Sequence, residues 1–120
     1  ILNIIGAGGE RPSAGYIAGA GANAGLMAIT RAMGGVSRRH GVRVLGINPG
    51  LIVTERLETM QRSLAEKKFG DPERWQEMLD PEHPPGQVAH VADAAAFLVS
   101  GLSSNTTGTI LTVDGGHCAR

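Results

Sequence analysis

Apolar residues are arranged along the chain in two ways: in short continuous runs and in longer segments with helical spacing. The continuous runs are ILNII at residues 1–5, VRVLGI at 42–47 and a third at 109–113. Runs of this length are typical of strands that are buried on both faces of a parallel sheet. We therefore predict three strands, the second of them stopped by Asn48-Pro49-Gly50.

The intervening segments predict helices and loops. Residues 16–40 have helical spacing, with large apolar side chains among alanines and glycines: Ile17, Leu26, Ile29 and Met33. Residues 88–102 are expected to turn four apolar side chains inward: Val91, Ala95, Leu98 and Val99. Residues 55–79 are amphipathic, with apolar positions at Leu57, Met60, Leu64, Trp75 and Met78. Residues 6–15 and 80–86 are expected to be loops.

The order strand, helix, strand, helices, strand builds a parallel sheet with helices packed on its faces. The predicted fold class is therefore α/β. No repeat or linker composition divides the 120 residues, so we expect one structural unit. The first strand, residues 1–5, is expected to form an exposed apolar edge unless another strand or chain covers it.

Composition narrows the classes of function. Eleven basic and eleven acidic residues cancel, which disfavours a nucleic-acid or anionic-membrane partner. A single cysteine, Cys118, excludes an internal disulfide framework, and no His/Cys cluster has zinc spacing. The absence of such a cluster also means that we expect no bound metal. No membrane-length apolar run or signal peptide is present, so we expect a cytoplasmic protein.

The first strand is followed by the glycine-rich sequence Gly6-Ala7-Gly8-Gly9, which is similar to the phosphate-binding turn of a dinucleotide site. Pro12 and Gly15 argue against this interpretation, because they delay the helix whose N-terminus would hold the phosphate. The second strand also ends at Asn48-Pro49 instead of a ribose-binding carboxylate. The phosphate loop is therefore the weaker alternative.

Three segments together resemble the carboxy-terminal half of a short-chain dehydrogenase/reductase. They are ILNII with its glycine loop, GVRVLGINPGLIVT at 41–54 and TGTILTVDGG at 107–116. They occur in the order of that family and cover essentially the whole chain. The resemblance implies that residues 1–120 are the carboxy-terminal half of one doubly wound, Rossmann-type domain, with three parallel strands and flanking helices, that needs its amino-terminal half. It also implies that residues 55–85 are a substrate lid, whose apolar residues either line a pocket or form an ordinary helix face.

The same resemblance implies an NAD or NADP site around the Pro49-Gly50 turn. Pro49 fixes φ there, and Gly50 keeps a side chain away from the nicotinamide. The Ile52 backbone would bond the cofactor carboxamide and Thr54 its amide or phosphate. The alternative role for Thr54, compatible with the first, is the N-cap of the following helix.

In the family, a serine, a tyrosine and a lysine carry the chemistry, and the lysine lowers the pKa of the phenol. Aligning on Asn23-Ala-Gly-Leu26 places Gly6, Gly19 and Asn23 at these three positions, so all three are changed. Asn23 can still hydrogen-bond a cofactor ribose, but it supplies no charge.

Tyr16 is the candidate replacement for the proton donor, with Ser13 beside it, because it lies one helical turn before Gly19. Ala20, four residues later, offers no cation, and an unassisted phenol is a poor base at neutral pH. The alternative is that Tyr16 packs its ring and sends its hydroxyl to water or backbone.

The resemblance implies an oxidoreductase that transfers a hydride between NAD(P) and a small alcohol or carbonyl compound. The alternatives are a catalytically silent member that binds a nucleotide or a partner, and a pure assembly module. In the family, the helix at residues 16–40 helps form a dimer interface, which implies a homo-oligomer. Its three glycines, Gly19, Gly21 and Gly25, fit either close helix packing or open space over a cofactor.

Overall fold

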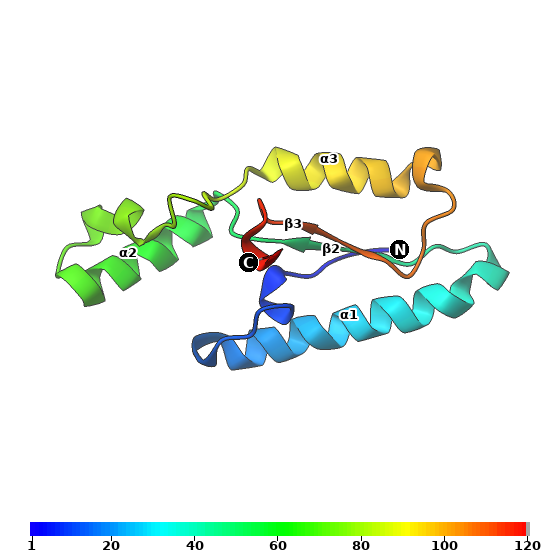
Figure 1. Cartoon of the computed structure of the whole chain (residues 1–120), viewed down its shortest axis with the longest axis horizontal. Coiled ribbons are helices and arrows are strands. Elements are labelled where there is room, and N and C mark those ends of the chain that lie inside the picture. Colours follow the sequence, from blue (N-terminus) through cyan, green and yellow to red (C-terminus); the bar gives the residue numbers. More distant parts are fainter. Residues whose placement is uncertain (120) are drawn as a thin grey trace.

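The computed structural model describes residues 1–119 and contains a parallel sheet between two helices (Figure 1). The strands pair in the order β1-β2-β3, and both pairings are parallel. Their bounds are Leu2–Ile4 for β1, Leu45–Pro49 for β2 and Ile110–Val113 for β3. The α-helices are α1, Ile17–Ser37; α2, Glu55–Phe69; and α3, Val88–Val99. The predicted α/β class with three parallel strands is confirmed.

The central strand β2 divides its side chains between the two faces of the sheet. Leu45 and Ile47 are buried against Leu98 of α3, and this cluster forms the hydrophobic core. Gly46 and Asn48 point to the opposite face, where they lie near side chains of α1. Figure 1 shows the sheet between α3 and α1, so helices cover both faces.

Helix α1 packs on the sheet through small and medium residues, and not through its large apolar residues. The side chains that α1 buries are Ala20, Met27, Thr30 and Gly34. The four large apolar residues predicted for this helix are exposed, at 38% to 73%: Ile17, Leu26, Ile29 and Met33. The backbones pack closely at Gly34, because a Cβ there would overlap the backbone of Gly108, which precedes β3.

Two element boundaries differ from the predictions. Strand β2 does not stop before Asn48 but runs to Pro49, because Pro49 still lies opposite Val113 and the N–H of Gly50 donates to Val113 O at 3.0 Å. Helix α3 ends at Val99, which is 60% exposed, so the prediction that Val99 faces inward is wrong. The helix ends there because Ser100 is extended.

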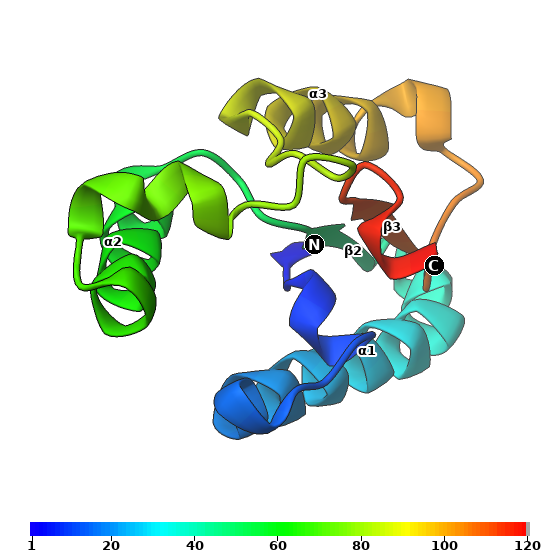
Figure 2. The same cartoon turned by 60° about the vertical axis from the view of Figure 1, so that its left-hand side comes forward.

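Residues 55–78 form an arm that projects beyond the carboxyl ends of the strands (Figures 1 and 2). The arm consists of α2 and the 3₁₀ helix η4, Pro72–Met78, and helps to give the molecule an extent of 56 Å against 27 Å and 25 Å. Helix α2 buries Leu57 together with Gln61 and Ala65. Met60 and Leu64, predicted as apolar positions, are 45% and 40% exposed.

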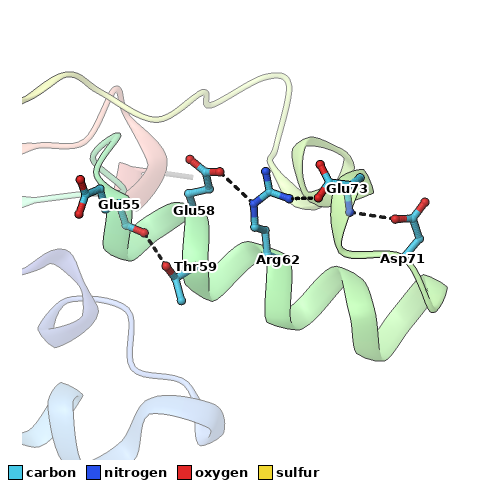
Figure 3. A network of polar contacts seen from close by, with 6 residues as sticks. All are labelled: Glu55, Glu58, Thr59, Arg62, Asp71 and Glu73. Atoms are coloured by element: carbon cyan, nitrogen blue, oxygen red, sulfur yellow. Dashed lines mark hydrogen bonds and ion pairs between the residues drawn. The ribbon is translucent and has the colours of Figure 1, made fainter.

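Arg62 joins the two helices of the arm (Figure 3). Its guanidinium bonds Glu58 one turn earlier on α2, at 2.9 Å, and Glu73 on η4. These two carboxylates raise the pKa of Arg62 above its ordinary value. The ion pairs are exposed, so they orient the arm more than they stabilise the fold.

Strand β1 lies at one edge of the sheet. Ile1 and Ile4 are 64% and 54% exposed, which confirms the predicted apolar edge. No helix within residues 1–119 has the length and hydropathy that crossing a bilayer requires.

Candidate active site

The carboxyl ends of the three strands meet at one edge of the sheet, where open α/β sheets bind ligands. The end of β1 is tied to the end of β2, because the N–H of Gly6 donates to Oδ1 of Asn48 at 3.2 Å. Residues of α1 lie against the same loop, since the 3₁₀ turn Ala7–Gly9 packs on that helix. The site is therefore built from the Gly6 loop, the end of β2 and the start of α1.

Asn48 is fully buried and organises a polar network that sequence reasoning missed. Its Nδ2 donates to Oε1 of Glu10 at 2.7 Å, and Oγ1 of Thr112 on β3 donates to the same oxygen at 2.9 Å. Glu10 and Asn48 thus connect all three strand ends. The available signal was Asn48 itself, because a polar side chain at the end of a buried strand needs a partner.

The phenol ring of Tyr16 lies over two glycines. A Cβ at Gly19 would overlap the ring and the hydroxyl of Tyr16, and a Cβ at Gly8 would lie 3.1 Å from ring atoms Cδ1 and Cε1. Tyr16 is nevertheless 48% exposed. The glycine at position 19 therefore provides the space that this tyrosine occupies.

The carboxamide of Asn23 lies against the other glycines of the loop. A Cβ at Gly6, whose φ is +147°, would stand 2.8 Å from Asn23 Nδ2. At Gly9 a Cβ would be 2.9 Å from both Asn23 Cβ and the backbone N of Ala24. The glycines after β1 thus permit close packing on α1, a role that needs no bound phosphate.

Ser13 occupies a different position from the one expected for a partner of Tyr16. Its carbonyl accepts the N–H of Tyr16 at 3.0 Å, at the start of a 3₁₀ turn. It lines an open, largely apolar groove of about 350 Å³ between the loop and α1, together with Ile17 and Gly21. Within residues 1–119 no hydrogen bond joins the Ser13 hydroxyl to the Tyr16 phenol.

The four residues predicted to contact the cofactor at the end of β2 and in the segment after it are Pro49, Gly50, Ile52 and Thr54. A Cβ at Gly50 would be 2.7 Å from Cβ of Asp114. Close packing on Asp114 therefore requires glycine at position 50, in addition to the space that the nicotinamide would need. Ile52 forms an isolated parallel β-bridge with Gly86, and the hydrogen bonds of this bridge are made by its neighbours Leu51 and Val53. The N–H of Ile52 itself has no partner among the described residues.

Thr54 caps α2, as the alternative interpretation predicted. Its Oγ1 accepts the N–H of Leu57 at 3.2 Å, and Glu55 and Glu58 occupy the first turn, where carboxylates favour the helix dipole. Thr54 Oγ1 also donates to Ile52 O at 3.3 Å. The hydroxyl is therefore already engaged, although a hydroxyl oxygen accepts a second bond.

Asp114 and Cys118 line a cavity of about 260 Å³ with Glu10. Burial opposes ionisation of Asp114, but N–H groups of Cys118 and Gly116, at 2.7 and 2.9 Å, hold its pKa below the ordinary value. Burial, Asp114 and Glu10 together raise the pKa of the Cys118 thiol from 9.0 to about 11. The thiolate form of Cys118 is therefore disfavoured at neutral pH.

We expect iodoacetamide to alkylate Cys118 about 100-fold more slowly at pH 7.5 than an unperturbed thiol, because only the thiolate reacts. The rate should rise with pH until the thiol ionises near pH 11. Mass spectrometry of the Cys118 peptide measures this rate, and the urea-unfolded protein is the control. Modification of the folded protein at the unfolded rate would contradict the assigned environment.

One cluster of potential metal ligands lies in the loop after η4. Asp80, Glu82 and His83 offer ligand atoms within 4.8 Å of one another. His83 Nδ1 also pairs with Asp80 at 3.4 Å. Exposed acidic groups commonly occur without an ion, and we propose no metal here.

The fold and site define a parallel α/β protein with a ligand edge at the carboxyl ends of its strands. Residues 1–117 match the family model described as enoyl-(acyl carrier protein) reductase. The chain belongs to this family, within the short-chain dehydrogenases/reductases that its sequence resembles.

Two relatives illustrate the similarity. Gluconate 5-dehydrogenase of Gluconobacter oxydans is 38% identical over 73% of this chain and 32% of its own length. L-xylulose reductase of Caenorhabditis elegans is 30% identical over 97% of this chain and 44% of its own length. A solved structure, 3-ketoacyl-(acyl-carrier-protein) reductase of Brucella melitensis complexed with NADH, has a TM-score of 0.78 at 28% identity. The match covers 98% of this chain and 44% of the Brucella melitensis reductase chain. The chain thus spans less than half the length of these proteins.

Proposed function

We propose that the protein carrying this chain is an oxidoreductase that transfers a hydride between NAD or NADP and a small alcohol or carbonyl compound. The chain then forms the carboxy-terminal half of one Rossmann-type domain, with residues 55–85 as the substrate lid. The family supports this function, as do similar proteins that reduce L-xylulose or bind NADH. The exposed β1 edge fits a strand supplied by the amino-terminal half.

One observation carries the proposal. The Ile52 N–H follows the carboxyl end of β2 and the Tyr16 side chain lies over the loop after β1, and neither polar group has a hydrogen-bond partner within residues 1–119. The free N–H suits a carboxamide oxygen, while Pro49, Gly50 and Thr54 shape the turn beside it. Asn23 Oδ1 suits a ribose hydroxyl. A bound nicotinamide cofactor supplies or accepts the hydride, and Tyr16 exchanges the proton of the substrate oxygen.

A catalytically silent nucleotide- or partner-binding protein is the second candidate. It is favoured by the residues that align with the serine, tyrosine and lysine of the family. These residues are Gly6, Gly19 and Asn23, and they provide neither a hydroxyl nor a cation. In either case we infer a homo-oligomer, since α1 exposes a row of apolar side chains on its outer face: Ile29, Met33 and Val36.

The test is cofactor affinity in the full-length protein, measured by calorimetry with NADH and NADPH. Ile52→Pro removes the free N–H and should weaken binding about tenfold, the value of one good hydrogen bond. Ile52→Ala keeps the N–H and should bind like the parent. If neither cofactor binds, the proposed function fails. Binding without turnover of any alcohol or ketone would establish the silent alternative.

A further inference from the structure

The peptide group between Gly86 and Gln87 is held at both ends, where the chain passes from the arm into α3 (Figure 1). Its carbonyl, that of Gly86, accepts the N–H of Val53 at 2.8 Å, which ties it to the segment that leads into the arm. Its N–H, that of Gln87, donates to Nδ1 of His90 at 3.1 Å. A peptide group is planar, so a rotation that breaks one of these bonds also disturbs the other.

His90 is the third residue of α3, and its imidazole closes a capping box at the start of that helix. Capping boxes are usually closed by Glu or Gln at this position, and their side chains keep an acceptor oxygen between pH 5 and 8. Nδ1 of histidine accepts a hydrogen bond only while the imidazole is neutral. Gly86 leaves room for the ring, since a Cβ there would stand 3.3 Å from Nδ1. The start of α3 is therefore capped by a group that can lose its acceptor.

The surroundings of His90 contain few charges. The three strands and the 3₁₀ helix η5, Gly101–Ser103, pack on α3, and none of them carries a charged or titratable side chain. The titratable groups nearest to this end of α3 lie on the helix itself, in the loop before it and after β3: Asp93, Asp80, Glu82, His83 and Asp114. His90 is exposed and forms no ion pair with these groups within residues 1–119. Its own protonation therefore decides the state of the cap.

We propose that His90 is a pH-sensitive fastening of the arm, closed while its imidazole is neutral and open once the imidazole is protonated. An imidazolium carries a hydrogen on both ring nitrogens, so Nδ1 then offers no acceptor to the Gln87 N–H. The peptide group between Gly86 and Gln87 loses one of its two bonds and can rotate, which weakens the bond from Val53. Histidine changes its charge between pH 8 and 5, so the arm is attached more loosely at the acidic end of this range. Such a fastening acts whether or not residues 55–85 serve as a substrate lid.

Amide hydrogen exchange in the full-length protein, read by mass spectrometry at residue resolution, measures both bonds through the N–H groups of Gln87 and Val53. The parent is compared at each pH with His90→Gln, whose side chain always accepts, and with His90→Ala, which has no acceptor. At pH 8 the Gln87 N–H of the parent should exchange about fivefold more slowly than in His90→Ala, the usual effect of one cap, and as slowly as in His90→Gln. At pH 5 the parent should exchange as fast as His90→Ala, while His90→Gln stays protected. The Val53 N–H should change in the same direction.

His40→Gln is the matched control, because His40 is exposed and follows the end of α1, away from the arm (Figure 1). This variant should keep the pH response of the parent. The inference is overturned if the parent and His90→Gln differ by the same ratio at pH 8 and pH 5, or if His90→Ala exchanges like the parent at pH 8. A response at Gln87 without one at Val53 would show that protonation opens only the helix cap, and would refute the link to the arm.

Discussion

Gly34→Ala is expected to destabilise the protein by about 3 kcal/mol or more, the upper range for adding a methyl group to a closely packed site. The new Cβ would overlap backbone atoms N and Cα of Gly108, and neither backbone has a flexible side chain that can yield. Helix α1 would have to move away from the turn before β3. Urea unfolding of the full-length protein measures the loss as a lower midpoint.

Gly35→Ala is the matched control, one residue further along α1. Nothing lies within 4 Å of a Cβ built there, so alanine should stabilise the helix by up to about 1 kcal/mol. Equal effects at positions 34 and 35 would show that helix propensity, and not the contact with Gly108, determines both results.

Arg43→Met is expected to cost about 3 kcal/mol, because one guanidinium serves several carbonyls at and after the end of α3 at once. Arg43 donates to the carbonyls of Leu98, Val99 and Ser100 at 2.8, 3.2 and 3.1 Å. It also bonds Oγ of the buried Ser103 at 2.9 Å. Methionine keeps the aliphatic stem but removes the donor to the Val99 carbonyl, and it leaves the Leu98 and Ser100 carbonyls with the Ser103 hydroxyl alone.

Arg43→Lys separates charge from geometry. A single ammonium keeps the charge but lacks the planar fork that reaches several acceptors at once, so we expect an intermediate loss of stability. Thermal unfolding of the full-length protein compares the three side chains. If lysine proved fully equivalent to arginine, one hydrogen bond and the charge would account for the whole contribution.

The strands and helices were readable from the sequence because their apolar periodicity is strong. The packing of α1 was not, because Ile29 and Met33 have the spacing of a buried face and yet point outward. This orientation includes a close contact between Gly34 and Gly108, two glycines distant in sequence. The pattern of apolar residues along the chain does not reveal a contact between two glycines.

The candidate site was predicted in part. The turn after β2 and the Thr54 cap were found because Pro, Gly and Thr have specific backbone roles. The sequence placed Tyr16 one turn from Gly19 but could not show that its ring fills the space at that glycine. Glu10 was missed because its partners, Asn48 and Thr112, come from other strands, and a hydrogen bond across a sheet leaves no local pattern.

The arm of α2 and η4 has an architectural consequence. The segments that lead into and out of the arm lie side by side at the parallel bridge between Ile52 and Gly86. Two hydrogen bonds of 2.8 Å hold them there, from Gly86 N–H to Leu51 O and from Val53 N–H to Gly86 O. An insertion joined at a single point can change in length or shape without shifting the strands. The part of the chain between these residues is therefore fastened at its base, and a change in its length is expected to leave the sheet and its ligand edge in place.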